Sequence, residues 1–265
     1  MMFSTNNSRH TFYAIFTFLG ALVLLFIIAP LLGLILSTAP TDFFQTSADQ
    51  EVLRSVARTL IISMASTIIL GFFSIPLAYI LARKNFYLKR LVLGIVDLPI
   101  VIPHAAAGIA ILGFISRDSF VGQAADNIGL NFVGHPAGIG IAMAFVSVPF
   151  LINAAREGFQ AVPEKLEHAA LNCGASMSRV FFTVSLPLAW RSIITGFILM
   201  FARGLSEFGA VVIVAYHPMV TSVLIYERFG AFGLQYARPV AVLFILITLV
   251  FFVVLRMLTP GSKNA

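Results

Sequence analysis

The sequence predicts an all-α protein that crosses a membrane six times. Three observations predict this fold class. Only 11% of the 265 residues are charged, whereas soluble domains carry about 25%. The mean hydropathy is +0.98, and six long segments are almost free of charge. So few charges cannot cover a globule in water, so the hydrocarbon core of a bilayer is the expected solvent.

The six apolar segments are predicted to be helices, because a chain in lipid must satisfy its backbone hydrogen bonds within each segment. Most of them reach the roughly 20 residues that a helix needs to cross about 30 Å of hydrocarbon. No alternating pattern typical of membrane strands competes with this prediction. The predicted spans are Phe12–Leu36, Thr59–Ala82, Leu91–Ile115, Ala137–Ala155, Ser192–Tyr216 and Pro239–Leu255.

The first span resembles a signal peptide only superficially. Arg9 precedes it, but its uncharged run from Phe12 to Leu36 is longer than the roughly 7–15 residues of a signal-peptide core. We therefore expect this segment to stay in the mature protein.

Basic residues predict the orientation. If the N-terminus is cytoplasmic and the chain crosses six times, most of the 17 Lys and Arg residues fall on the inner side, as the positive-inside rule requires. We therefore predict that both termini are cytoplasmic. The inner residues are Arg9, Arg83, Lys84, Lys89, Arg90, Arg156, Lys165, Arg179, Arg191, Arg256 and Lys263, and the outer ones are Arg54, Arg58, Arg117, Arg228 and Arg238.

Composition also argues against several kinds of site. The net charge of +6 does not indicate nucleic-acid binding, because no basic stripe with interleaved aromatic residues occurs. The single Cys173 excludes an intrachain disulfide. His104, His135 and His217 are isolated in the sequence, so no metal site is predicted.

The inner loop 156–191 contains a second kind of helix. Its stretch Pro163–Asn172 mixes charged and apolar residues, begins with proline and is followed by Gly174. These features predict a short amphipathic helix. Such helices lie on membranes or on partner proteins.

The same loop carries a recognisable motif. It reads E-H-A-A-L-N-C-G from Glu167 to Gly174, followed at a fixed distance by V-S-L-P from Val184 to Pro187. This resembles the EAA loop of binding-protein-dependent ABC importer permeases, in which E-A-A, three residues, Gly and nine residues precede I-x-L-P. Aligned on Gly174, the loop departs from the motif at its namesake residue, because His168 stands at the Glu position.

The resemblance implies the type I ABC importer permease fold, with one permease domain over 1–265, a core over 55–258 and a coupling loop over 156–191. In this family the loop forms a coupling helix that sits in a groove of the ATPase subunit and transmits its closure. The residues expected to couple are Glu164, Leu166, Glu167, His168, Ala169, Ala170, Gly174, Val184, Leu186 and Pro187.

Two further stretches narrow the resemblance. D-L-P-I-V-I-P-H from Asp97 to His104 and A-R-G-L-S-E-F-G-A-V from Ala202 to Val211 resemble molybdate and tungstate permeases, particularly the archaeal type. Sulfate permeases carry a similar Arg-x-x-x-Glu-Phe-Gly stretch, so a sulfate or thiosulfate importer remains the alternative. A passive or ion-coupled transporter and a membrane-embedded enzyme are the rival classes.

The resemblance also implies partners. No G-x-x-x-x-G-K-[ST] stretch occurs in the sequence, so ATP and Mg²⁺ are expected on a separate ATPase subunit. This chain is then no enzyme and needs no cofactor. We expect a homodimer of permeases in the lipid bilayer, with two ATP-binding subunits inside and an oxyanion-binding protein outside.

Charges within the predicted spans mark candidate positions on the translocation route. Arg203 and Glu207 are four residues apart, so on one helix they share a face and can pair. The pair either fixes helix packing or lines the route of an oxyanion, where the glutamate prevents tight capture. Asp97 is expected to cap the helix segment that follows it. The full set of route and gate candidates is Arg203, Ser206, Glu207, Gly209, Asp97, Pro99 and Pro103.

Overall fold

The computed structural model describes residues 4–258, and these residues form helices and no strand. Four of the predicted spans each fall within one long apolar helix, so these four predictions are confirmed. The helices are α1 (Ser4–Leu36), α3 (Gln50–Arg83), α7 (Pro136–Ala161) and α13 (Leu234–Leu258). Helix α3 begins nine residues earlier than the predicted span, so Arg54 and Arg58 lie in the helix rather than in a loop.

The third predicted span, Leu91–Ile115, contains Pro99 and Pro103, which are expected to interrupt and bend it, and the structure breaks it at Pro103. The segment is two helices, α4 (Lys89–Val101) and α5 (His104–Ile115), which meet at 111°. Pro103 has no N–H and disfavours a helical conformation at the residue before it, and Ile102 is extended, with ψ 147°. Pro99, by contrast, is buried inside α4 and does not end it.

The predicted bounds of the fifth span, Ser192–Tyr216, are wrong. One apolar span runs from Met177 to Leu205, built from α9 (Met177–Val180), the π-helical segment η1 (Phe181–Ser185) and α10 (Leu186–Leu205). The chain then leaves the helix and restarts as α11 (Gly209–Val214). The restart has a local cause, because the Glu207 carboxylate accepts a hydrogen bond from the Ala210 N–H at 2.9 Å and so satisfies a free donor of α11.

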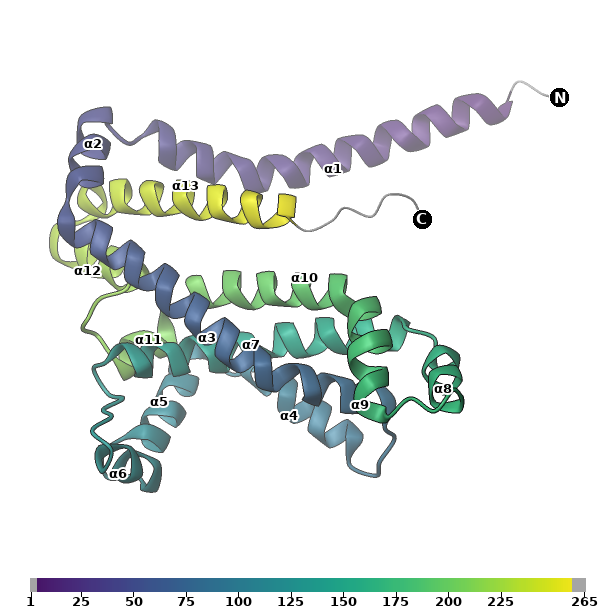
Figure 1. The fold of residues 1–265 in the computed structure, drawn as a ribbon. Coiled ribbons are helices and arrows are strands. Elements are labelled where there is room, and N and C mark those ends of the chain that lie inside the picture. The colour runs from purple at the N-terminus through teal and green to yellow at the C-terminus, as the bar shows by residue number, and fades with distance from the viewer. Residues whose placement is uncertain (1–3, 259–265) are drawn as a thin grey trace.

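The helices run between two ends of the molecule (Figure 1). The N-terminal end of α1, the C-terminal end of α13 and the helix α8 lie towards one end. The connecting helices α2, α6 and α12 lie towards the other. Their bounds are α2 (Pro40–Ala48), α6 (Phe120–Asp126), α8 (Glu164–Asn172) and α12 (Thr221–Phe232).

Helix α7 lies at the centre of the bundle and packs against α3 and α10. Small residues let these helices approach closely, as is common in membranes. At Gly158 an added Cβ would lie 2.5 Å from the Ser192 Cβ, and at Gly204 it would lie 2.7 Å from the Ser63 Oγ. Helix α1 differs from these packed helices, because its most apolar stretch has no buried residue.

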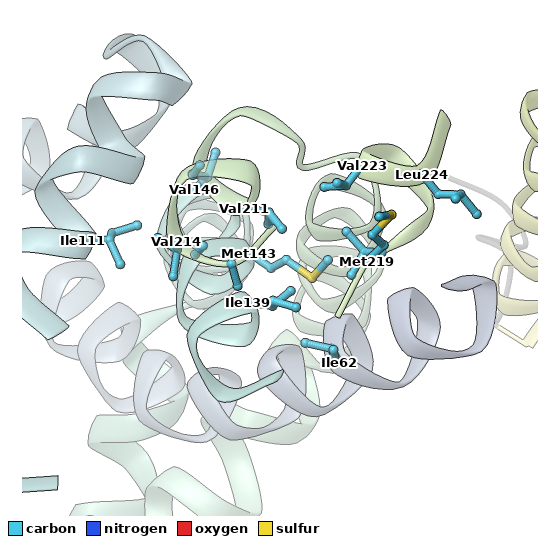
Figure 2. Close-up of a cluster of buried hydrophobic side chains, with 14 of the residues drawn as sticks. Ile62, Ile111, Ile139, Met143, Val146, Val211, Val214, Met219, Val223 and Leu224 are labelled. Atoms are coloured by element: carbon cyan, nitrogen blue, oxygen red, sulfur yellow. The ribbon is translucent and has the colours of Figure 1, made fainter. Parts of the chain in front are cut away.

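The main core cluster joins α3, α5, α7, α11 and α12 (Figure 2). Ile62, Ile111 and Met143 supply its α3, α5 and α7 contacts, and Val211 and Val223 add those of α11 and α12. This core holds the short helices α5 and α11 against the long ones. The core therefore holds the helix that begins after each break, α5 after the first and α11 after the second.

Candidate functional site

The helix in the coupling loop is confirmed within one residue of its predicted bounds. Helix α8 begins directly after Pro163 and ends before Gly174, whose φ is +86°. The Ala175 N–H bonds the Ala170 carbonyl at 3.1 Å, and the Gly174 N–H bonds the Leu171 carbonyl at 2.9 Å. This pair of bonds is a Schellman motif, which needs a left-handed residue and so favours glycine. The motif glycine thus ends the helix and turns the chain towards α9.

Glu167 is the inward-facing residue of α8. Its Oε1 accepts bonds from Arg83 Nη2 at 2.7 Å, from Arg83 Nε at 2.9 Å and from Ser185 Oγ at 2.7 Å. Its Oε2 accepts a longer bond from the Tyr79 hydroxyl at 3.3 Å. Arg83 Nη2 also donates to the Val162 carbonyl at 2.9 Å. We call Glu167, Arg83, Tyr79 and Ser185 the inner hub, because one carboxylate joins α8 to the end of α3 and to η1.

The inner hub keeps Glu167 ionised. Burial alone raises the pKa of this carboxyl, but the hydrogen bonds from Arg83 and Ser185 and the charge of Arg83 outweigh burial. The net effect is a pKa below the ordinary value. The Arg83 and Glu167 side chains are both almost buried, so the charges compensate each other away from water.

The rest of α8 faces outward. Glu164, Leu166, His168 and Ala169 are exposed, and Ala170 is half-buried. The residue at the motif's Glu position, His168, is therefore available to a partner, whereas its neighbour Glu167 is not. A cavity of about 160 Å³ lies between α8 and the end of α3 and is lined by residues that include His168, Leu171 and Met177.

The second half of the motif spans the junction of η1 and α10, because Val184 and Ser185 end η1 and Leu186 and Pro187 begin α10. Val184 and Leu186 are half-buried and Pro187 is exposed. Proline at position 187 cannot donate to the carbonyl four residues earlier, and its ring clashes with that carbonyl in a regular α-helix. The widened turn of η1 relieves this clash. It also places Ser185, which is fully buried, against Glu167.

A second polar cluster lies where the two broken spans meet. Glu207 Oε2 is 2.7 Å from His104 Nδ1 and 3.0 Å from Arg203 Nη2. We call His104, Arg203 and Glu207 the outer corner. The predicted pairing of Arg203 with Glu207 is confirmed, but the two do not share a helix face, because Arg203 lies in the last turn of α10 and Glu207 lies in the linker after it.

Three other predicted residues surround the outer corner. Ser206 is exposed and accepts a 3.3 Å hydrogen bond from Arg203 Nη1. Gly209 faces His104, and a Cβ added there would lie 2.7 Å from the His104 Cβ. Pro103 precedes His104 as the N-cap of α5. His104 stands alone in the sequence, but in the structure its ring contacts both Glu207 and Arg203.

The prediction that Asp97 caps the following helix is also wrong. Asp97 lies inside α4, and its Oδ1 accepts a 2.6 Å bond from Asn153 Nδ2 on α7. The cap position of α5 belongs to Pro103 instead. Asp97 thus joins the first half of the broken span to the central helix and takes no part in the outer corner.

Sequence reasoning missed four residues of the two clusters: Arg83, Tyr79, Ser185 and His104. Ser185 stands inside the V-S-L-P motif and His104 ends the D-L-P-I-V-I-P-H stretch, so the motifs themselves carried a signal for both. Arg83 and Tyr79 lie 84 and 88 residues from Glu167, and no local pattern marks them.

Known proteins agree with this architecture. A family model described as "Binding-protein-dependent transport system inner membrane component" matches residues 74–264. The chain is 42% identical over 261 residues to the molybdate/tungstate transport system permease protein of Pyrococcus abyssi, which covers 96% of this chain and 98% of the relative. It is 34% identical over 191 residues to a probable sulfate transport system permease protein of Chlorokybus atmophyticus, which covers 71% of this chain and 67% of the relative.

Among solved structures, the crystal structure of a bacterial ABC transporter that imports the polysaccharide alginate has a similar chain. The TM-score is 0.75 at 17% identity, over 98% of this chain and 99% of that one. This likeness confirms the predicted type I ABC importer permease fold. With the family match over most of its length, the chain belongs to the binding-protein-dependent transport system inner membrane components, a family of membrane-spanning ABC transporter subunits.

Proposed function

We propose that this chain is the membrane-spanning subunit of an ATP-driven importer of molybdate and tungstate. The observation that carries the proposal is the 42% identity to an archaeal molybdate/tungstate permease over nearly the whole of both chains. The sulfate relative is less similar and matches a shorter part of the chain. Both breaks that form the outer corner fall in the stretches that the molybdate/tungstate resemblance rests on.

The proposed assembly contains two copies of this chain, two ATP-binding subunits that bind ATP and Mg²⁺, and an external protein that delivers the oxyanion. Six spans form half of a pathway, and a two-fold axis between two copies would complete it. The exposed face of α8, with Leu166 and His168, supports docking of an ATPase subunit, because these side chains are open to solvent.

The inner hub supports a coupling role for α8. Glu167 attaches α8 to α3 and, through Ser185, to the span that contains α10. A push on α8 would therefore move both helices together, because the hydrogen bonds and the ion pair leave little freedom between them. In this proposal His168 contacts the ATPase and Glu167 passes the motion inward.

The orientation is part of the proposal. We place the end of the molecule that carries α8 in the cytoplasm, together with the N-terminal end of α1 and the C-terminal end of α13, which lie towards the same end in Figure 1. The excess of basic residues in the loops at that end supports this orientation.

The test is the ATPase activity of the reconstituted complex of permease, ATPase and binding protein, compared in molybdate, tungstate and sulfate. We expect stimulation by molybdate and tungstate alone. Stimulation by sulfate would make the chain a sulfate importer subunit, and uptake without ATP would place it among passive transporters. A permease that binds no ATPase subunit would contradict the coupling proposal.

A further inference from the structure

In the outer corner the carboxylate of Glu207 is buried, whereas the side chains of His104 and Arg203 are partly exposed. The Glu207 side chain is 0% exposed, while the side chains of His104 and Arg203 are 44% and 22% exposed. Both carboxylate oxygens are already occupied, Oε2 by His104 and Arg203 and Oε1 by the Ala210 N–H. Arg203 Nη2 also lies 2.9 Å from His104 Nε2. An anion that reaches this corner therefore meets the exposed side chains of Arg203 and His104 and no free carboxylate oxygen.

Arg203 lies on the same side of α10 as Arg191 and Thr195, with the exposed Leu199 between Thr195 and Arg203, and none of these residues is buried. Ser206 follows the end of the helix and is also exposed. Polar and charged side chains in a membrane helix face protein or a water-filled cavity rather than lipid. This face of α10 therefore borders water or another protein surface, and the outer corner lies at one end of it.

Both helices that meet at the corner are interrupted. Helix α5 starts at His104 after the 111° bend, and the span that contains α10 stops at Leu205, two residues before Glu207. Transporters often build their substrate sites where membrane helices are discontinuous. The Ser222 hydroxyl donates to the Glu207 carbonyl at 2.9 Å, so α12 also holds this linker in place.

From these observations we propose that His104 and Arg203 contact a tetrahedral oxyanion on its way through the membrane, and that Glu207 is the residue that positions them. The proposal rests on the importer function above and adds His104 as a substrate contact. Glu207 neutralises the charge of Arg203, so the corner can contact a dianion without holding it tightly. A conducting site must bind its cargo weakly enough to let it leave.

The experiment measures oxyanion uptake into proteoliposomes that contain the whole complex and ATP, at saturating loaded binding protein. Each uptake rate is divided by the basal ATP hydrolysis of the same complex without substrate. The variants are His104→Asn, His104→Gln and Arg203→Gln. The matched control is His135→Asn, because His135 is exposed, precedes α7 and makes no side-chain cap bond.

We expect His104→Asn and Arg203→Gln to lower maximal uptake by about tenfold or more, since a hydrogen bond to a charged group contributes on the order of that factor. Uptake should fall more than basal hydrolysis does, so that the ratio of the two rates falls. His104→Gln should recover part of the rate, because its longer amide replaces Nε2, whereas asparagine replaces only the Nδ1 that bonds Glu207. His135→Asn should transport like the wild type.

A role confined to the bond with Glu207 gives the opposite order, because asparagine keeps that bond and would then rescue transport while glutamine would not. That order overturns the proposal, as does wild-type uptake in both His104 variants. If the wild-type complex transports sulfate instead of molybdate, the proposed substrate is wrong. The uptake rate of each variant relative to the wild type, measured with sulfate, then still tests whether the outer corner contacts the oxyanion.

Discussion

Two buried carboxylates, Glu167 and Glu207, organise the polar contacts of this chain. Each accepts bonds from residues far away in the sequence, Arg83 at a separation of 84 and His104 at 103. Leaving either carboxylate without its partners would strand a charge away from water, which is far more costly than losing a surface ion pair. Both residues therefore constrain several helices at once.

Replacing Glu167 tests the inner hub. We expect Glu167→Ala to lower the free energy of unfolding by about 3–5 kcal/mol, because it leaves the nearly buried Arg83 unpaired. Denaturant-induced unfolding of the detergent-solubilised protein measures this change in the free energy of unfolding. Glu164→Ala on the exposed side of the same helix is the control and should stay within about 0.5 kcal/mol. Equal stability of the two variants would show that the hub has no net effect.

The same carboxyl predicts a pH dependence. The pKa of Glu167 is lower in the folded chain than its ordinary value of 4.5. Its contribution to stability is therefore fully present above pH 4.5 and is lost as the pH falls below that value through the folded-state pKa. The melting temperatures of the wild type and of Glu167→Gln should converge over this acidic range. A difference that does not change with pH would contradict this assignment.

The candidate site was partly predictable from sequence. The spacing of Gly174 and Pro187 is local, so it located α8 and the turn before α10. The partners of Glu167 and Glu207 were not predictable, because they depend on which helices pack together. The displaced motif glutamate is now explained, since Glu167 points inward and His168 points outward.

At the scale of elements, the sequence located the spans and, through its prolines, the first break, but not the second break. Hydropathy averages over side chains and does not record whether the backbone continues as a helix, so Leu91–Ile115 and Ser192–Tyr216 read as single spans. Pro103 supplied a signal for the first break. The second break depends on the hydrogen bond that the Glu207 carboxylate accepts from the Ala210 N–H. Because glutamate is otherwise a good helix former, the sequence gives no signal for this break.

The contact between α5 and α11 gives a prediction at this scale. A Cβ added at Gly108 would lie 2.9 Å from the Ala210 Cα and 3.0 Å from its carbonyl oxygen. Because these are backbone atoms, α5 must move, and we expect Gly108→Ala to destabilise the fold by about 1–3 kcal/mol.

Gly113→Ala on the same helix is the matched control, since no atom lies within 4 Å of its added Cβ. That variant should match the wild type or gain slightly in stability, because alanine favours a helix. Thermal unfolding of both variants decides the matter. A Gly108→Ala chain as stable as Gly113→Ala would mean that α5 and α11 separate without cost.

For the whole molecule, the single exposed Cys173 reports the orientation. We expect a membrane-impermeant maleimide to label it in inside-out vesicles and not in right-side-out ones. Bound ATPase subunits should slow the labelling, because Cys173 directly follows α8.

A second cysteine supplies the opposite readout. Phe120→Cys in a Cys173→Ser background places the thiol on α6, at the other end of the molecule, where residue 120 is exposed. It should label only in right-side-out vesicles. Labelling of both positions from the same side would refute the six-crossing topology.

The bend between α4 and α5 also bears on how the chain is made. Its halves have 13 and 12 residues, and at about 1.5 Å per residue neither crosses the hydrocarbon alone. The backbone groups at the bend need cover from α7 and α11, which the ribosome synthesises afterwards. Biogenesis of this segment therefore cannot finish in step with translation. The insertion machinery must shelter it until about residue 214 has emerged, whereas α1 and α3 are free to enter the lipid as soon as they are complete.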